Sequence, residues 1–294
     1  MKLPKFDYAC PGTIEEAVAL LARADGTARP ISGGQSLMPM LAFRLVQPSL
    51  LVDLRHVPGL ATITIDNDGV HLGAKVRWCD IETSAALQAA HPILTAAVRH
   101  IAHHQIRTRG TIGGSIAHAD PAAEMPCVAV LCDAEIEIVG SAGKRKIPAT
   151  SFFKGPLMTA LQPDELITGI RFPAWPAARR WAFEEFARRR GDFALAGIGM
   201  FFDMRDDKAG NVHIAAFGIG DTPLRLANAE AALNNRPLTD AVIKACCQAG
   251  HQEVDPPDDI HGSSAYRRGL VDYLLGQSLR RLTGHSSKAG ANAH

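Results

Sequence analysis

The sequence contains few of the features that mark secreted, membrane or nucleic-acid-binding proteins. It has six cysteines in 294 residues but no C-x-x-C pair, and the cysteine spacing does not suggest a disulfide framework. The N-terminal stretch MKLPKFDYACPG lacks the apolar segment of a secretory signal, and no apolar run approaches the roughly 20 residues that a membrane-spanning helix needs. A formal net charge of +1 gives no electrostatic reason to expect a nucleic acid or a membrane surface as a partner. We therefore expect a soluble protein of a reducing compartment and predict a cytoplasmic location.

Catalytic and metal-binding patterns are also missing. Cys127 and Cys132 have the first interval of a plant-type [2Fe–2S] ligand set, but the cysteine that should follow is absent, so a core helix is favoured. His100, His103 and His104 have no carboxylate or thiolate at ligand spacing, which favours a solvated helix face over a metal site. No Walker motif and no G-x-G-x-x-G fingerprint with a ribose-binding acid occurs. We therefore predict no general acid, base, nucleophile or metal ligand in this chain.

The order of the predicted elements favours an α+β fold. Thr13 to Glu16 read as a capping box that starts a helix ending near Ala24. Up to residue 171 we further predict strands at 29–31 and 50–54, hairpins at 61–74 and 135–147, a helical stretch at 78–104 broken at His91-Pro92, and a helix at 122–132. The two prolines in 172–176 indicate a linker. Beyond it we predict strands at 181–187, 195–203 and 211–219, then helices at 225–234, 239–250 and 263–282. Strands followed by helices are typical of α+β domains.

Two small-residue loops are the strongest local signal of a binding site. Gly33-Gly34 and Gly113-Gly114 lack a Cβ and permit positive φ, so successive backbone N–H groups can converge on an anion. Serine and threonine hydroxyls add donors, and a helix starting at Gln35 would add its positive dipole end. Two such loops could clamp a diphosphate, whereas either loop alone is more often a turn. The residues by themselves leave both interpretations open.

Longer motifs extend around and beyond these loops. They are P-I-S-G-G-Q-S-L-M-P-M-L-A-F-R-L at 30–45 followed by V-D-L at 52–54, Q-I-R-T-R-G-T-I-G-G-S-I-A-H-A-D-P-A-A-E-M-P at 105–126, F-K-G-P-L-M-T-A-L-Q-P-D-E-L-I at 153–167, R-R-G-D-F-A-L-A-G at 189–197 and G-I-G-D-T-P-L-R at 218–225. Together they resemble the FAD-binding medium subunit of molybdenum hydroxylases, in the xanthine dehydrogenase family. The resemblance spans nearly the whole chain and is closest to carbon monoxide dehydrogenase medium-subunit-like flavoproteins.

The resemblance implies that the two loops hold the diphosphate of FAD. The residues it assigns to this task are Ser32, Gly33, Gly34, Gln35, Ser36, Thr111, Ile112, Gly113, Gly114 and Ser115. Many relatives have asparagine where Ser115 stands, and serine makes fewer hydrogen bonds than asparagine. Distant relatives that reduce NAD carry a lysine near the position of Glu185, so a basic flavin contact is not transferred here.

Four further residues are implied as cofactor contacts. Asp120 and Glu124 lie on the stretch that approaches the ribityl or ribose hydroxyls, although Asp120 could equally cap a helix that starts at Pro121. Ile167 aligns with an apolar residue that touches the cofactor, and Phe193 with an aromatic position beside the isoalloxazine. Core packing is the alternative for both of these side chains.

The resemblance also implies the domain layout and the role. We expect an α+β protein with a PCMH-type FAD-binding domain at 1–176, in subdomains of about 1–55 and 56–176. A C-terminal domain at 177–282, with a three-stranded antiparallel sheet and helices, and a tail at 283–294 would follow. The chain would take electrons from the [2Fe–2S] clusters of a small partner subunit and pass them from FAD to an external acceptor.

A large subunit with molybdopterin would act on the substrate, in a dimer of heterotrimers. Two other functions stay open: a stand-alone flavin oxidoreductase with its own organic substrate, and a non-catalytic FAD-binding assembly subunit.

Overall fold

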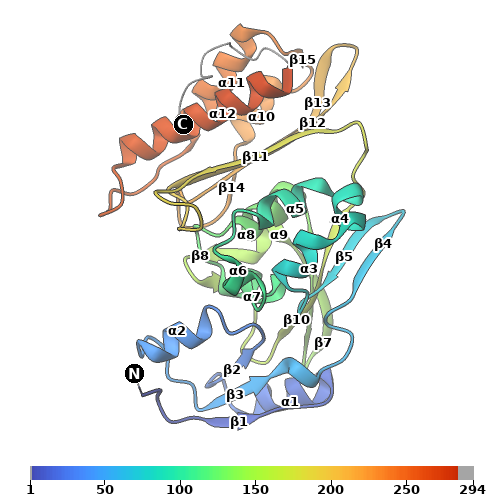
Figure 1. Cartoon of the computed structure of the whole chain (residues 1–294), viewed down its shortest axis with the longest axis vertical. Coiled ribbons are helices and arrows are strands. Elements are labelled where there is room, and N and C mark those ends of the chain that lie inside the picture. The colour runs from blue at the N-terminus through green and yellow to red at the C-terminus, as the bar shows by residue number, and fades with distance from the viewer. Residues whose placement is uncertain (1, 284–294) are drawn as a thin grey trace. The chain divides into compact units, whose positions relative to one another are not determined.

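The computed structural model describes residues 2–283 and consists of two compact units (Figure 1). Unit 1 comprises the chain up to Asp120 together with residues 132–175. Unit 2 comprises residues 121–131 and the chain from Pro176 onward. Helix α8 (Glu124–Leu131) therefore belongs to unit 2, although the chain up to Asp120 and again from Cys132 to Trp175 belongs to unit 1. The predicted tail lies outside the described residues apart from Thr283.

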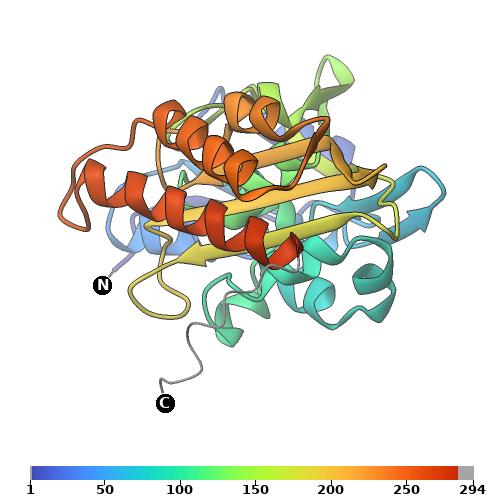
Figure 2. The ribbon, with the colours of Figure 1, turned by 90° about the horizontal axis from the view of Figure 1, so that it is seen from above.

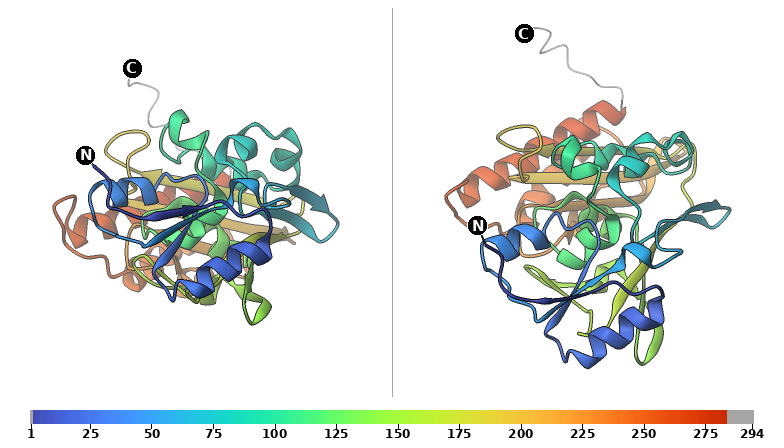
Figure 3. Two further views of the ribbon diagram at one scale, coloured as in Figure 1. Left: turned by 90° about the horizontal axis from the view of Figure 1, so that it is seen from below. Right: turned by 60° about the horizontal axis from the view of Figure 1, so that its bottom comes forward.

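Unit 1 begins with a small parallel sheet in the order β1-β3-β2. Its strands are β1 (Asp7–Ala9), β2 (Ala28–Ile31) and β3 (Leu50–Asp53). Helix α1 (Ile14–Arg23) contacts β2 and β3 with an apolar face that the sequence pattern predicted (Figure 3). The hydroxyl of Thr13 accepts a hydrogen bond from the Glu16 N–H at 3.1 Å and caps the helix. The carboxyl end of β2 delivers the chain to the first glycine loop.

The rest of unit 1 is built on an antiparallel sheet in the order β4-β5-β10-β6-β7. Its strands are β4 (Ile63–Asp66), β5 (Gly69–Gly73), β6 (Glu135–Gly140), β7 (Gly143–Pro148) and β10 (Leu166–Pro173). The pairs β4–β5 and β6–β7 confirm the two predicted hairpins. A short hairpin of β8 (Phe153–Gly155) and β9 (Met158–Thr159) precedes β10.

A side-chain pair spans the central strand of this sheet. His71 on β5 reaches Glu137 on β6, with Nε2 3.0 Å from Oε2, across the intervening β10. Gly169 on β10 makes the contact possible, because a Cβ there would lie 2.4 Å from His71 Nε2. Burial by itself raises the pKa of Glu137, but the hydrogen bonds and charges of His71 and Lys146 outweigh it and lower that pKa.

The other helices of unit 1 are short. They are α2 (Leu37–Ala42), α3 (Trp78–Thr83), α4 (Ala85–Ala90), α5 (Pro92–Val98), α6 (His104–Arg107), α7 (Ile112–His118) and α9 (Ala149–Phe152), with a 3-10 turn at Leu54–His56. The prediction of one helical stretch at 78–104 with a single break is wrong. A second break falls at Ser84, whose hydroxyl caps α4, and residues 99–103 are not helical.

Unit 2 is a second antiparallel sheet with helices on both faces. Three long strands, β11 (Arg180–Phe186), β12 (Ala196–Arg205) and β13 (Lys208–Phe217), pair antiparallel, as predicted. Two short strands, β14 (Leu224–Arg225) and β15 (Arg236–Pro237), add to β13. Helices α10 (Ala227–Leu233), α11 (Asp240–Glu253) and α12 (Ser264–Thr283) cover one face (Figure 2).

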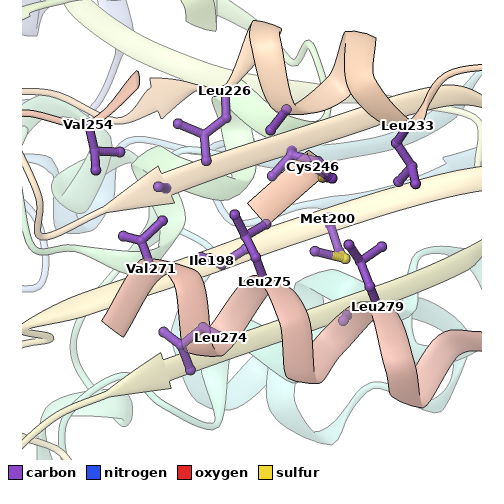
Figure 4. Packing of buried hydrophobic residues seen from close by; sticks show 14 of the residues in the cluster. Ile198, Met200, Leu226, Leu233, Cys246, Val254, Val271, Leu274, Leu275 and Leu279 are labelled. Carbon is purple, nitrogen blue, oxygen red and sulfur yellow. The ribbon is translucent and has the colours of Figure 1, made fainter. Parts of the chain in front are cut away.

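The core of unit 2 explains this layering. Ile198 and Met200 on β12 point toward Leu275 and Leu279 on α12 (Figure 4). Burying each of these leucines, which are fully covered, stabilises the fold by roughly 1.5–3 kcal/mol. Because side chains alternate along a strand, Gly199 faces the other way, where a Cβ would lie 2.6 Å from Leu131 of α8. Helix α8 therefore covers the second face, which explains why it is buried all round from Met125 to Leu131.

Residues 2–283 contain neither a membrane-spanning helix nor a cluster of metal ligands. No helix in that range combines the length and the hydropathy that crossing a membrane requires. No three histidine, cysteine, aspartate or glutamate side chains in the same range gather as ligands for a metal ion.

Candidate functional site

The two glycine segments meet in unit 1. The hydroxyl of Thr111 donates to the hydroxyl of Ser32 at 3.2 Å. Next to this contact, the backbone at Gly33 lies so close to the other segment that a Cβ would stand 2.2 Å from the carbonyl oxygen of Arg109. The same Cβ would lie 2.9 Å from Cα of Gly110. The fold thus brings together the two segments that the sequence singled out and requires glycine at position 33 for the approach.

The first glycine loop, residues 32–36, offers backbone donors. Within the described part of the chain, no protein acceptor is paired with the N–H groups of Gly33, Gly34, Gln35 and Ser36, all of them half-buried. Gly34 adopts a φ of +72°, which strongly favours glycine. Adjacent unpaired N–H groups in such a turn form a concavity that suits an anion. The loop therefore fits the diphosphate interpretation.

The helix after this loop begins later than predicted. Helix α2 starts at Leu37 rather than at Gln35, and the Ser36 side chain does not cap it. The side chain of Gln35 instead turns back, and its amide donates to the Gly33 carbonyl at 3.2 Å. This bond stabilises the turn, while the N–H groups of the loop stay available.

The second glycine segment differs from the loop that the sequence suggested. Gly113 and Gly114 lie in the first turn of α7, which is a helix of seven residues. The N–H of Ile112 donates to the Val76 carbonyl at 3.0 Å, and the N–H of Gly113 donates to the Ala74 carbonyl at 2.9 Å. The prediction that this pair supplies unpaired backbone donors is therefore wrong.

The requirement for glycine at position 113 comes from packing. A Cβ at Gly113 would lie 2.5 Å from the Cβ of Ala74. The N–H of Gly114 donates to the hydroxyl of Thr111 at 3.3 Å, so Thr111 caps α7 while it also contacts Ser32. Ser115 is half-buried, one turn into the helix. On this side of the site the groups suited to bind a ligand are side-chain hydroxyls.

Ile167 lies on β10, in the core of unit 1. It is 6% exposed and pairs with Ile138 of β6, just before an irregularity in the ladder. The backbone of Ala74 connects this place to α7, since its N–H donates to the Thr168 carbonyl at 3.0 Å and its carbonyl accepts from Gly113. Ile167 thus lies in the core of the strand, as the alternative interpretation predicted. Its contact with a cofactor stays a prediction.

Asp120 and Glu124 fall in different units. Asp120 is half-buried and follows Ala119, which ends α7 in the left-handed conformation with a φ of 52°. The alternative that Asp120 caps a helix starting at Pro121 is wrong, because α8 begins at Glu124. Glu124 is half-buried at that helix start. The structure therefore leaves carboxylate contacts to a cofactor as a prediction for both residues.

Phe193 occupies the loop between β11 and β12 in unit 2. Its side chain is 72% exposed, so the core-packing alternative is wrong. The N–H of Leu195 donates to the Phe186 carbonyl at 2.8 Å and closes the base of the loop. An aromatic ring this exposed is available to contact a ligand or a partner.

A buried carboxylate next to the first glycine loop was missed in the sequence. Asp53 ends β3 and pairs in register with Ile31, which directly precedes Ser32. It is 4% exposed and accepts hydrogen bonds from the Tyr8 hydroxyl at 2.7 Å and from the Arg55 side chain at 2.8 Å. Burial alone raises the pKa of Asp53, but the bonds from Arg55 and Tyr8 outweigh it and lower that pKa. Its position at the carboxyl end of a buried strand was the available signal.

Comparison with known proteins assigns both parts of the chain. Residues 4–175 match the family described as the FAD binding domain in molybdopterin dehydrogenase. Residues 181–282 match the CO dehydrogenase flavoprotein C-terminal domain. The two matches define a flavoprotein of the molybdopterin dehydrogenases and confirm the predicted α+β fold with its two kinds of domain.

Full-length relatives narrow this class. The chain is 41% identical over 279 residues to the nicotine 6-hydroxylase medium subunit of Paenarthrobacter nicotinovorans, covering 95% of this chain and 98% of that protein. It is 33% identical over 276 residues to the carbon monoxide dehydrogenase medium chain of Hydrogenophaga pseudoflava, covering 94% and 96%. A solved structure of carbon monoxide dehydrogenase from that organism matches with a TM-score of 0.94 at 34% identity, covering 98% of this chain and 100% of that chain.

The chain belongs to the FAD-binding medium subunits of the molybdenum hydroxylase family, and is thus a subunit of an oxidoreductase. FAD is the cofactor of the domain that spans residues 4–175.

Proposed function

We propose that this chain is the electron relay of a molybdenum hydroxylase complex. It would take electrons from the [2Fe–2S] clusters of a small partner subunit and pass them on to an external acceptor. A large molybdopterin subunit would act on the substrate. FAD supplies the relay chemistry, because its flavin exchanges electrons both singly and in pairs. The protein supplies position and electrostatics.

One observation carries the proposal: the contact between the first glycine loop and the start of α7. Ser32 and Thr111, from segments far apart in the sequence, share a hydrogen bond, so both predicted diphosphate segments belong to one site. The N–H groups of residues 33–36 are suited to hold the phosphate oxygens, with the Ser32 hydroxyl as a further donor. The remaining predicted contacts are proposals that follow the family resemblance: Ile112, Gly113, Gly114, Ser115, Asp120, Glu124, Ile167 and Phe193.

The ionised carboxylate near this loop has a structural task. Asp53 already accepts hydrogen bonds from Tyr8 and from both the backbone and the side chain of Arg55. A carboxylate bonded in this way stays ionised at neutral pH and does not exchange protons with a substrate. It fixes the ends of β1 and β3 beside the loop, which suits a site that binds a cofactor in one defined orientation.

The partners follow from the relatives. Two of them are named as the medium subunit of nicotine 6-hydroxylase and as subunit alpha of the 6-hydroxypseudooxynicotine dehydrogenase complex. By analogy we propose a large and a small partner for this chain, and a dimer of such heterotrimers in the cytoplasm.

The test compares the isolated chain with the complex. The three subunits are co-expressed, and the flavin absorbance is followed under anaerobic conditions after addition of the hydroxylation substrate. We expect reduction of FAD in the complex and no reduction in the isolated chain. Turnover by the isolated chain would establish a stand-alone oxidoreductase instead. A complex that turns over equally well after removal of its FAD would show that this subunit serves assembly.

A further inference from the structure

The loop that carries Phe193 is held at both of its ends by the same part of unit 2. At its start, Arg188 donates through Nη2 to the carbonyl of His261 at 2.9 Å. At its end, the carbonyl of Leu195 accepts from Nη1 of Arg267 at 2.7 Å. His261 belongs to the turn Asp259–Gly262, which directly precedes α12. We call Arg188, this turn and Arg267 the loop clamp.

Arg267 is the central residue of the loop clamp. It lies in the first turn of α12 and is 5% exposed, which is unusual for an arginine. Besides Leu195, its Nη1 donates to the Gly218 carbonyl at 2.8 Å, and its Nη2 donates to Asp259 Oδ2 at 2.7 Å. The three acceptors bind Nη1 and Nη2, and the Asp259 carboxylate compensates the buried charge, so together they fix the side chain.

Asp259 is oriented for this ion pair by its own turn. Its other oxygen, Oδ1, accepts the N–H groups of His261 at 2.8 Å and Gly262 at 3.0 Å. The hydrogen bond from Arg267 is the main reason why the pKa of Asp259 falls to about 2. The Asp259 carboxylate is therefore ionised throughout the physiological pH range.

The same arginine also reaches the segment that leads to α8. The N–H of Gly218 donates to the carbonyl of Pro121 at 2.9 Å, and the carbonyl of Gly218 accepts from Arg267. Pro121 stands three residues before Glu124, which begins α8. One buried side chain thus connects the loop of Phe193 with the segment before Glu124, and these two residues are the proposed cofactor contacts of unit 2.

We propose that Arg267 is the positioning residue that sets the place of Phe193 relative to the flavin, and that Asp259 keeps Arg267 in the required orientation. The proposal rests on the proposed function, because it assumes that Phe193 lies beside the isoalloxazine. The loop is fixed at Arg188 and Leu195, and the side chain of the phenylalanine between these points is 72% exposed. Removing one anchor therefore moves the ring without removing it.

The test uses Arg267→Lys and Asp259→Asn in the complete complex. We expect each variant to change the rate at which the reduced flavin reacts with ferricyanide or oxygen by about tenfold. The rate at which substrate reduces the flavin through the partner subunits should change much less. Asp259→Asn leaves the Arg267 side chain itself unchanged, so it tests the positioning role even if Arg267→Lys fails to fold.

A double-mutant cycle with Phe193→Ala separates positioning from general stability. If Arg267 acts through the loop, Arg267→Lys adds no further change once Phe193 is alanine. The matched control is Arg179→Lys, because Arg179 also forms an ion pair, in this case with two hydrogen bonds to Asp203, at the opposite end of the β11–β12 ladder. We expect this control to lower the melting temperature and to leave unchanged the rate at which ferricyanide or oxygen oxidises the reduced flavin.

Two results would overturn the inference. One is an Arg267→Lys variant whose flavin has the same oxidation rate and the same reduction potential as the flavin of the parent. The other is a double variant of Arg267→Lys and Phe193→Ala whose change in flavin oxidation rate equals the product of the changes in the two single variants. The reduction potential of FAD in the isolated chain gives the same comparison without partners, so failure of the electron relay would not be mistaken for failure of the clamp.

Discussion

The hydroxyl of Thr111 lies 3.2 Å from the hydroxyl of Ser32, although the two residues are 79 positions apart in the sequence. Thr111 is 6% exposed and also accepts the N–H of Gly114, so a single side chain caps α7 and contacts the first glycine loop. The position of the loop and the start of the helix are therefore coupled. This contact brings the two glycine segments together.

Replacing Thr111 with alanine should weaken FAD binding more than it weakens the fold. Loss of the cap on α7 costs about 1 kcal/mol of stability. Loss of the contact with Ser32 also frees the first loop, so we expect FAD to dissociate at a higher chain concentration than it does from the parent. Flavin fluorescence during dilution of the purified chain measures this effect.

Thr13→Ala is the matched control for this variant. Thr13 caps α1 through Glu16 in the same way, but it is exposed and lies outside the glycine segments. We expect it to lower the melting temperature by a similar amount and to leave FAD affinity unchanged. Equal loss of affinity in both variants would show that Thr111 acts through stability alone.

Adding a single methyl group at Gly33 should separate the two segments. The Cβ of Gly33→Ala would stand 2.2 Å from the Arg109 carbonyl oxygen, so one backbone segment must move. Strain of this kind costs roughly 1–3 kcal/mol, and we expect the purified chain to lose most of its FAD. Gly34→Asp should have the same outcome for another reason, because it places a negative charge in the loop and a side chain at a φ of +72°.

Gly12→Ala is the control for both glycine variants. Its Cβ would meet no atom closer than 3.7 Å, and its φ is not in the left-handed region. The FAD content of this variant should equal that of the parent, as measured by the ratio of flavin to protein absorbance. A yellow Gly33→Ala protein with full flavin stoichiometry would refute the proposed diphosphate site.

The sequence predicted elements well wherever a local pattern determines them. The hairpins β4–β5 and β6–β7 and the three long strands of unit 2 follow from alternation and turn residues. Helix α8 shows the limit of such reasoning. Its apolar residues predicted a buried helix, but only the tertiary fold determines that it covers the sheet of unit 2 rather than that of unit 1.

The candidate site shows the same limit at the level of single residues. The pair Gly113-Gly114 suggested an anion-binding loop, yet Gly113 is glycine because Ala74 lies against it. That contact depends on a segment nearly forty residues away, so no local pattern could reveal it. Arg267 was missed for the same reason, because its acceptors Leu195, Gly218 and Asp259 come from three separate segments.

Removing the ring of Phe193 should change the reactivity of the flavin and preserve its binding. Phe193 is 72% exposed and packs little against its own unit, so Phe193→Ala should cost almost no stability. If the ring lies beside the flavin, its loss changes access to the reactive edge and shifts the reduction potential. Stopped-flow oxidation of the reduced complex by oxygen and a potentiometric titration measure the two effects.

The exposed Tyr273→Ala variant controls for loss of a surface aromatic ring. Tyr273 is 59% exposed on α12 and is not a predicted cofactor contact. Its removal should change neither the reduction potential nor the rate of oxidation. Identical redox behaviour of Phe193→Ala and the parent would count against the placement of Phe193 beside the flavin.

Acid should destabilise unit 1 through Asp53, and the direction follows from its hydrogen bonds. The bonds from Arg55 and Tyr8 overcome the effect of burial and hold the pKa of Asp53 below its ordinary value of 3.8. A carboxylate with a lowered pKa in the folded state stabilises the fold fully above the unfolded value, and this stabilisation disappears as the pH falls through the folded pKa. We therefore expect the melting temperature to decrease once the pH is lowered below about 4. Asp53→Asn should remove part of this pH dependence and should lower the stability at pH 7.

Asp7→Asn, which changes an exposed carboxylate in the same sheet, is the control and should melt like the parent at every pH. If Asp53→Asn retained the full acid dependence of the parent, a group other than Asp53 would be responsible for that dependence.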